Sequence, residues 1–334
     1  MKYPFTDDHI QRARKHPGMF LGSADIRGVH QLIFSFVKEL MDESKKASVF
    51  IEFHLDRCGT IYITCDFPTG IKDSFGLGVI KALSCNFDLH VGPGSFKLQF
   101  KPDKSVLSYE KIEYHSLLRR FTELAQLNEN IKFLLTDHEN KNVIQFHHGL
   151  EAMLMDDVYG FLLCERKPFS IQFSRGDIAV SVSMIYAYAS DVTLSYVNQD
   201  RTQDGGVHVN GLYDGLLCAF QEYIQTQAID FDIVKDHPLF FLIERLDDEP
   251  YRFDESPTVS REDVISGLNF VISITTAHPK WEGSVKRHLL GEEVYLAVKD
   301  GLIEKLKAIL ASDPSFFYSS RVFQKAELRK IESQ

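Results

Sequence analysis

The sequence predicts an α+β protein built from two domains. Its 334 residues suggest two domains of ordinary size. Apolar residues recur at intervals of three and four between Val29 and Asp42, which predicts an amphipathic helix. Val49–Leu55 and Thr60–Cys65 then alternate apolar and polar residues, as half-buried strands do. We therefore expect an open sheet with helices covering one face.

The first half of the chain, up to about His148, contains further elements of both kinds. A short polar helix is expected over Asp7–Lys15. His16–Gly18 should end it, because proline restricts the residue before it and glycine permits a sharp change of direction. Farther along we expect a short helix over 79–84, strands at 87–91 and 96–100, a helix over 116–128, and strands at 131–136 and 143–147.

The second half is expected to begin with a helix over 149–163 and a hinge near residues 148–168. Strands are then expected at 171–173, 178–188, 193–197 and 269–275, and helices at 211–227, 259–268, 294–310 and 321–331. The predicted domains are therefore residues 1–148 and 149–334.

The charge balance argues against independent DNA binding. The chain has 47 acidic and 37 basic residues, a net charge of -10 and a pI near 5.7. DNA-binding domains usually have a high pI. The first residues are polar, and no apolar run approaches the roughly 18 residues that cross a bilayer. We expect a cytoplasmic protein that makes no membrane contact.

The cysteines indicate neither disulfides nor a metal site. They are odd in number and scattered, without CxxC spacing, so we expect reduced, buried thiols. They are Cys58, Cys65, Cys85, Cys164 and Cys218. His147 and His148 have no cysteine or carboxylate at ligand spacing, so no metal site is predicted there.

Four short motifs lie in order along the chain: Arg14–Ser23 with Gly28–His30 after it, Gln203–His208, Arg261–Leu268 and Pro279–Lys286. They resemble signatures in the amino-terminal half of the B subunits of DNA gyrase and topoisomerase IV. Arg14–Ser23 is similar to the RKRPGMYIG signature of that family, and Gly28–His30 follows at the family spacing. Gln203–His208 is similar to RDGGTH, Arg261–Leu268 to GEDVREGL, and Pro279–Lys286 to PKFEGQTK. All of them occur in the family's order.

This resemblance implies a GHKL (Bergerat-type) ATPase sandwich followed by a transducer domain like ribosomal protein S5 domain 2. In the family, the ATPase domain binds ATP and Mg²⁺ and dimerises, and the transducer passes the signal to DNA-cleavage domains. The chain is expected to lack the TOPRIM and DNA-cleavage parts, and so to be no complete topoisomerase.

The long predicted helix departs from the family at the positions that carry the chemistry. The resemblance places the family's general base, a glutamate, at Ser35, whose hydroxyl has no basicity near neutral pH. The family's Mg²⁺-binding asparagine aligns with Glu39. A glutamate can bind Mg²⁺, but its charge opposes a polyphosphate unless a metal intervenes. We therefore predict no catalytic residue on this helix.

The loop that recognises adenine in the family is only partly kept. The resemblance places the family's adenine-binding aspartate at Asp66 and its second glycine at Gly70. Pro68 replaces the first glycine, which fixes φ and removes a donor. Asp66 could equally be an ordinary turn residue. ATP binding is therefore open, and so is Mg²⁺ binding.

The phosphate-binding part is the most reduced. Only residues 71–75 separate Gly70 from Gly76 and Gly78, where the family has a long lid and a glycine-rich cradle at a helix N-terminus. These glycines are either a remnant of that cradle or a tight turn. Lys286 aligns with the family lysine that reaches the γ-phosphate, although a loop lysine is otherwise a solvated charge.

Three functions follow from these observations. The first is a gyrase B-like module without ATP hydrolysis, a pseudo-ATPase that regulates or binds another protein. The second is an ATP-binding or ATPase subunit working with a separate DNA-cleavage chain. The third is a topoisomerase-directed inhibitor or DNA mimic. The partners considered are a second copy, a cleavage subunit and DNA. Only Met1–Thr6 precede the first helix, which argues against a dimer built by exchanged arms.

Overall fold

The computed structural model of the chain describes residues 5–43, 49–66, 74–92, 94–158, 167–187, 191–226, 258–283, 286–323 and 325–326. The chain divides into two compact units, Met1–Gly149 and Leu150–Gln334. Each unit encloses a hydrophobic core of its own, so the two are described separately.

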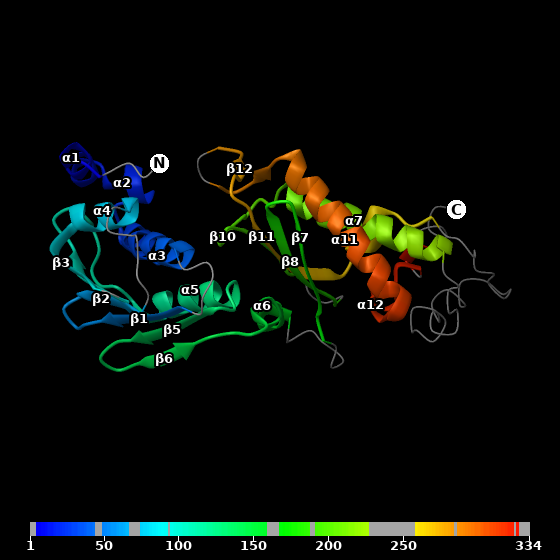
Figure 1. Ribbon diagram of the computed structural model, residues 1–334, viewed down its shortest axis with the longest axis horizontal. Helices are drawn as coiled ribbons and strands as arrows, with labels where there is room; N and C mark the ends of the chain where they lie inside the picture. The colour runs from blue at the N-terminus through cyan, green and yellow to red at the C-terminus, as the bar shows by residue number, and fades with distance from the viewer. Residues whose placement is uncertain are drawn as a thin grey trace. The chain divides into compact units, whose positions relative to one another are not determined.

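A six-stranded sheet forms the base of the first unit (Figure 1). Its strand order is β3-β4-β2-β1-β5-β6. β1 runs parallel to β5, and the other neighbours are antiparallel. The strands are β1 (Val49–Leu55), β2 (Ile61–Cys65), β3 (Ser84–Gly92), β4 (Ser95–Pro102), β5 (Ile131–Thr136) and β6 (Lys141–Ile144).

Helices of the first unit lie on one face of this sheet (Figure 1). They are α1 (Asp7–Lys15), α2 (Pro17–Leu21), α3 (Ile26–Glu43), α4 (Phe75–Ala82) and α5 (Tyr114–Gln126). Thr6 caps α1 in a capping box with His9, which satisfies backbone donors that the helix leaves unpaired. The resulting arrangement is the open sheet with one covered face that the sequence predicts.

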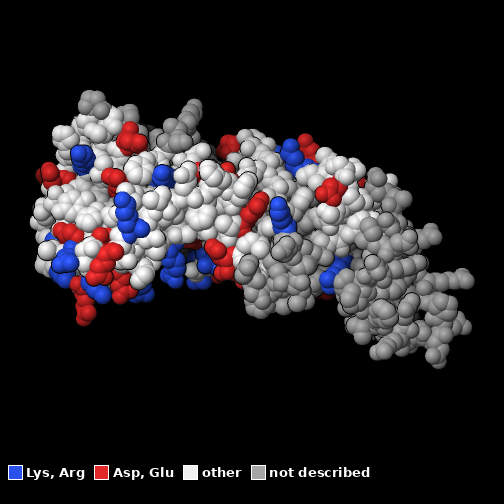
Figure 2. Space-filling view, turned by 90° about the horizontal axis from the view of Figure 1, so that it is seen from below, with Lys and Arg blue, Asp and Glu red and all other residues white. Residues whose placement is uncertain are grey.

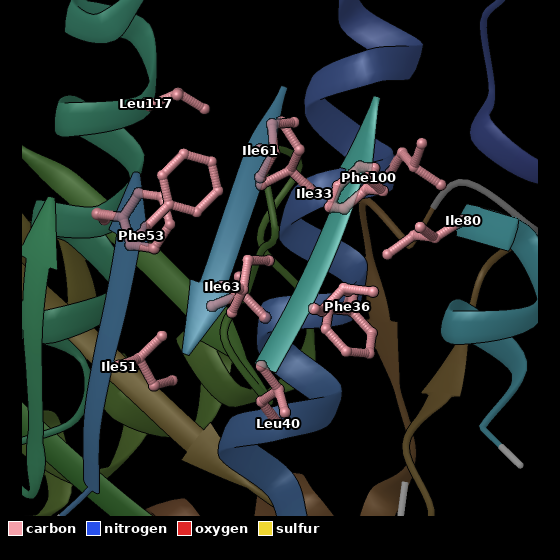
Figure 3. Packing of buried hydrophobic residues seen from close by; sticks show 14 of the residues in the cluster. Ile33, Phe36, Leu40, Ile51, Phe53, Ile61, Ile63, Ile80, Phe100 and Leu117 are labelled. Carbon is pink, nitrogen blue, oxygen red and sulfur yellow. The ribbon is translucent and has the colours of Figure 1, made fainter. Parts of the chain in front are cut away.

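Alternation along the strands builds the core beneath the helices. In β1, every second side chain is buried from Val49 to Leu55, and β2 repeats the pattern. Figure 3 shows Ile51, Phe53, Ile61, Ile63 and Phe100 of the sheet beside Ile33, Phe36 and Leu40 of α3. All eight are buried. The amphipathic face of α3 is thus the surface that closes the core.

The second unit is a five-stranded sheet with two long helices packed side by side (Figure 1). Its order is β10-β9-β11-β8-β7, with β9 and β11 parallel. The strands are β7 (Phe169–Arg175), β8 (Ile178–Tyr186), β9 (Thr193–Val197), β10 (Asp200–Arg201) and β11 (Leu268–Thr275). The helices are α6 (Gly149–Val158), α7 (Val207–Thr226), α10 (Arg261–Ile265), α11 (Glu292–Ser312) and α12 (Ser315–Ser320). A short pair, β12 (Lys280–Trp281) and β13 (Leu289–Leu290), lies between β11 and α11 in the chain.

The two long helices approach each other closely at glycines. A Cβ added at Gly211 of α7 would lie 2.7 Å from the carbonyl oxygen of Tyr295 in α11. One turn along α7, a Cβ at Gly215 would lie 3.0 Å from the carbonyl oxygen of Lys299. The absence of side chains at these positions sets the spacing of the α7–α11 pair.

The predicted fold class is confirmed, and most predicted elements are present. Two differences concern α2, which follows His16 directly, and α4, which begins four residues before the predicted helix over 79–84. The prediction that the cysteines are buried was wrong for Cys58 and Cys85, which are exposed free thiols. The part of the predicted 149–163 helix beyond residue 158, and the end of the 321–331 helix, lie outside the described residues.

Candidate functional site

Ser35 lies on α3, at the position predicted to have lost the general base. Its hydroxyl donates to the carbonyl oxygen of Gln31 at 2.6 Å, and the Gln31 amide Nε2 donates to the same hydroxyl at 3.0 Å. Serine hydroxyls commonly bond the carbonyl four residues earlier in a helix. The Ser35 side chain is therefore held against its own helix.

Glu39 lies one turn farther along α3 and reaches the start of α4. The backbone N–H of Gly76 donates to both carboxylate oxygens of Glu39, at 3.0 and 3.2 Å. Ser74 caps the same helix, accepting from the N–H of Leu77 at 3.2 Å. The N-terminus of a helix is a favourable site for an anion. Here a carboxylate of the chain itself takes that place.

Gly76 and Gly78 lie in the first turn of α4, so of the two possibilities considered for them the tight turn was wrong. Their lack of side chains serves close contacts within the chain. A Cβ at Gly76 would lie 2.6 Å from a carboxylate oxygen of Glu39. A Cβ at Gly78 would lie 2.4 Å from a ring carbon of Phe5. The Phe5 ring also meets Phe75, at 5.5 Å between ring centroids.

Asp66 directly follows β2 and is exposed. Its neighbour Cys65 is buried and lies opposite Phe96 of β4. Phe96 in turn contacts Phe36 of α3, with 5.8 Å between ring centroids. Aromatic side chains therefore fill the layer between α3 and the sheet next to Asp66. Gly70 and Pro68 lie outside the described residues.

Lys286 belongs to the second unit. Its backbone adopts a left-handed conformation, with φ of 54°. The ammonium Nζ lies 3.4 Å from a carboxylate oxygen of Asp200, and the Lys286 side chain is 55% exposed. Ser35, Glu39 and Asp66 belong to the first unit, so the role of Lys286 toward a phosphate stays a prediction.

A buried histidine in the second unit has no counterpart among the predicted site residues. His208, at the start of α7, is fully buried, and burial lowers its pKa to about 3. Its Nε2 lies 3.3 Å from the hydroxyl of Thr202, which also contacts the hydroxyl of Ser195. Its Nδ1 has no hydrogen-bond partner. The motif Gln203–His208 is therefore placed by packing and a small polar network.

Two cavities of the first unit lie away from the predicted site. One, of about 470 Å³, is lined by the β1–β2 and β5–β6 turns and the segment 109–115. The other, of about 560 Å³, is lined by His30, Asp25, Ser108, Glu113 and Ser116 among others. Neither includes Ser35, Glu39 or Asp66. No sequence motif marked these cavities, since their walls come from separate turns.

The described parts of the chain show mixed surface charge on the face in Figure 2 and no cluster of metal ligands. On the face shown in Figure 2, acidic and basic side chains are interspersed over the described surface. Among the described residues, no group of three or more His, Cys, Asp or Glu side chains could hold a metal ion. No helix in the described ranges is long and apolar enough to cross a membrane.

Comparison with known proteins bears on this combination of motifs and fold. The family described as DNA gyrase B matches residues 127–237. The DNA gyrase B protein of Staphylococcus epidermidis is 25% identical over 377 residues, covering 92% of this chain and 55% of that protein. The chain is similar to DNA gyrase B in sequence. It spans about half the length of the curated gyrase B proteins that it matches.

Other gyrase B proteins and solved structures agree. The gyrase B of Cytophaga hutchinsonii is 29% identical over 239 residues, covering 68% of this chain and 44% of that protein. The 43K ATPase domain of Thermus thermophilus gyrase B superposes with a TM-score of 0.76 at 20% identity, covering 97% of this chain and 96% of that chain. The topoisomerase IV ATP-binding domain of Francisella tularensis gives 0.72 at 19% identity, covering 96% and 98%.

The fold is therefore that of gyrase B ATPase domains with their transducer, and the predicted resemblance is confirmed. The structures show the fold alone, because identity is 20% or less. In this gyrase B-like chain, Ser35 and Glu39 lie on one face of α3, and the Glu39 carboxylate accepts a hydrogen bond from the Gly76 N–H. Asp66 is exposed, and Lys286 lies in the other unit.

Proposed function

We propose that this chain is a gyrase B-like module that does not hydrolyse ATP and acts as a regulatory or interaction protein. Hydrolysis of a triphosphate requires a base that orients the attacking water. Ser35 supplies no such base. Its hydroxyl already donates one hydrogen bond to Gln31 and accepts another from it. The proposal is therefore of a pseudo-ATPase.

The observation that carries the proposal is the contact between Glu39 and Gly76. A phosphate group would need the N–H groups at the start of α4, and the Glu39 carboxylate accepts one of them at 3.0 Å. A phosphate entering there would have to displace a covalently attached anion and tolerate its charge. The residues present thus do not fit a triphosphate.

A nucleotide titration tests this proposal. We expect purified chain to show no ATP turnover above background and no rise in melting temperature with ATP and Mg²⁺, because only a ligand that binds the native state stabilises it. Glu39→Asn removes the competing charge, so it should give a larger melting shift with ATP than the wild type does. Glu52→Gln, an exposed glutamate on β1, is the matched control and should change nothing.

Turnover by the wild type that is lost in Asp66→Ala would overturn the proposal. A melting shift without turnover would instead favour the ATP-binding subunit that works with a separate cleavage chain. Regulation of a topoisomerase is tested separately, by adding the chain to a supercoiling reaction of a complete gyrase. An unchanged supercoiling rate would count against that role.

A further inference from the structure

The strand β3 forms one edge of the first unit's sheet, with β4 as its neighbour. A register shift between Ser84 and Asn86 disturbs the start of this pair, and seven regular positions follow, from Asn86 to Gly92. An edge strand presents a row of unpaired backbone donors and acceptors. Edges are usually protected by lysine or proline, and residues 86–92 contain neither.

The side chains of β3 alternate in a way that suits a further strand. Phe87, Leu89 and Val91 pack against the core but stay only half-buried. Asp88 and His90 point to the other face and are exposed. On β4, Lys97 lies opposite His90. The exposed face of this edge therefore carries a carboxylate at 88, an imidazole at 90 and the Lys97 side chain opposite His90.

We propose that β3 pairs with β3 of a second copy of the chain, antiparallel and centred on Leu89. A two-fold axis at Leu89 makes the contact self-complementary. It sets Asp88 opposite the partner copy's residue 90, and this happens twice. The same axis sets Phe87 opposite the residue at 91 on the apolar face. In each of these two pairs, an imidazole N–H of His90 donates to the carboxylate of Asp88.

Other registers are less favourable. A centre at Asp88 would place two aspartates directly opposite each other, and like charges at such positions are destabilising. A centre at His90 would pair the two histidines and leave Asp88 opposite Gly92. A register shifted by one residue would place Phe87 and Leu89 of one copy on the same face as Asp88 and His90 of the other copy. Only the centre at Leu89 pairs each Asp88 carboxylate with an imidazole donor and also keeps the apolar side chains opposite one another.

A concentration series in the analytical ultracentrifuge tests the dimer. The wild type should dimerise, and His90→Asp should raise the dimer Kd on the order of tenfold or more, because two cross-strand pairs become repulsive. Asp88→Lys should weaken the dimer similarly. The double variant Asp88→Lys/His90→Asp sets a lysine opposite an aspartate in each pair, so it should recover the wild-type Kd.

Glu139→Lys is the control, because Glu139 is 74% exposed in the turn between β5 and β6, toward the opposite edge. It should leave the Kd unchanged, and unchanged melting temperatures would show that all variants fold. A wild type that stays monomeric over a 100-fold range of protein concentration would overturn the proposal. So would a dimer that resists both single variants, or a double variant no tighter than the singles. Such results would instead favour pairing of β3 with a strand of a different protein.

Discussion

At the residue scale, Glu39 accepts the hydrogen bond of a backbone N–H at the start of α4. The N–H of Gly76 is one of the donors that a helix leaves unpaired at its N-terminus. A half-buried carboxylate is a strong acceptor there and interacts favourably with the helix dipole. A side chain that aligns with a metal ligand of the family therefore accepts a hydrogen bond from a helix N-terminus in the structure.

Removing this acceptor should lower stability. We expect Glu39→Ala to reduce the free energy of unfolding by about 1 kcal/mol, the usual value of a helix N-cap. Urea denaturation measures the change, with Glu52→Ala on the exposed face of β1 as the control. No loss of stability relative to that control would mean that water replaces the carboxylate at no cost.

His208 should make the protein sensitive to mild acid. Burial lowers its pKa in the folded state to about 3, and the unfolded value is near 6.5. Between these values the unfolded chain binds the extra proton, so stability falls as pH decreases from 6.5. The slope for one such group is about 1.4 kcal/mol per pH unit at most.

His208→Gln should flatten this slope, since glutamine does not titrate and can still bond the Thr202 hydroxyl. Urea unfolding at pH 7, 6 and 5 measures it. His115→Gln, an exposed histidine at the start of α5, should keep the wild-type slope. Equal slopes for wild type and His208→Gln would show that other groups govern the acid limb.

At the element scale, the pair α7–α11 depends on glycine. Gly211→Ala would place a methyl group 2.7 Å from the carbonyl oxygen of Tyr295, and a backbone atom cannot turn aside as a flexible side chain can. The helices must move apart, and overpacking of this kind costs about 1–3 kcal/mol. Thermal or urea unfolding measures the loss.

Gly18 in α2 provides the contrasting case. A Cβ there meets nothing within 4 Å. Gly18→Ala should therefore leave stability unchanged or raise it by up to about 1 kcal/mol, because alanine is the better helix former. If both substitutions were equally tolerated, close packing at Gly211 would not limit the helix pair.

At the scale of the whole molecule, two separate cores indicate two folding units. The core of the first unit runs from Ala13 to Ile144, and that of the second from Ile171 to Ala326. Residues 1–149 expressed alone should therefore unfold cooperatively and keep the far-ultraviolet spectrum of a mixed α and β protein. A gradual, non-cooperative melt would show that this unit needs the rest of the chain.

Local patterns in the sequence were sufficient for the fold class. The amphipathic spacing of α3 and the alternation of β1 and β2 are properties of neighbouring residues, and these elements lie where the pattern predicts. The motifs from Arg14–Ser23 to Pro279–Lys286 were sufficient for the resemblance to gyrase B. Both results rest on short-range order that does not depend on knowing any tertiary contact.

What Glu39 does was decided by the tertiary structure alone. Its partner Gly76 is 37 positions away, so no helical spacing could connect them. The same holds for Gly78, because the Phe5 ring from the start of the chain occupies the position that a Gly78 side chain would take. The sequence by itself determined which elements form and which family they resemble. Only folding determined which backbone donors a distant carboxylate would satisfy, because that depends on where two elements meet.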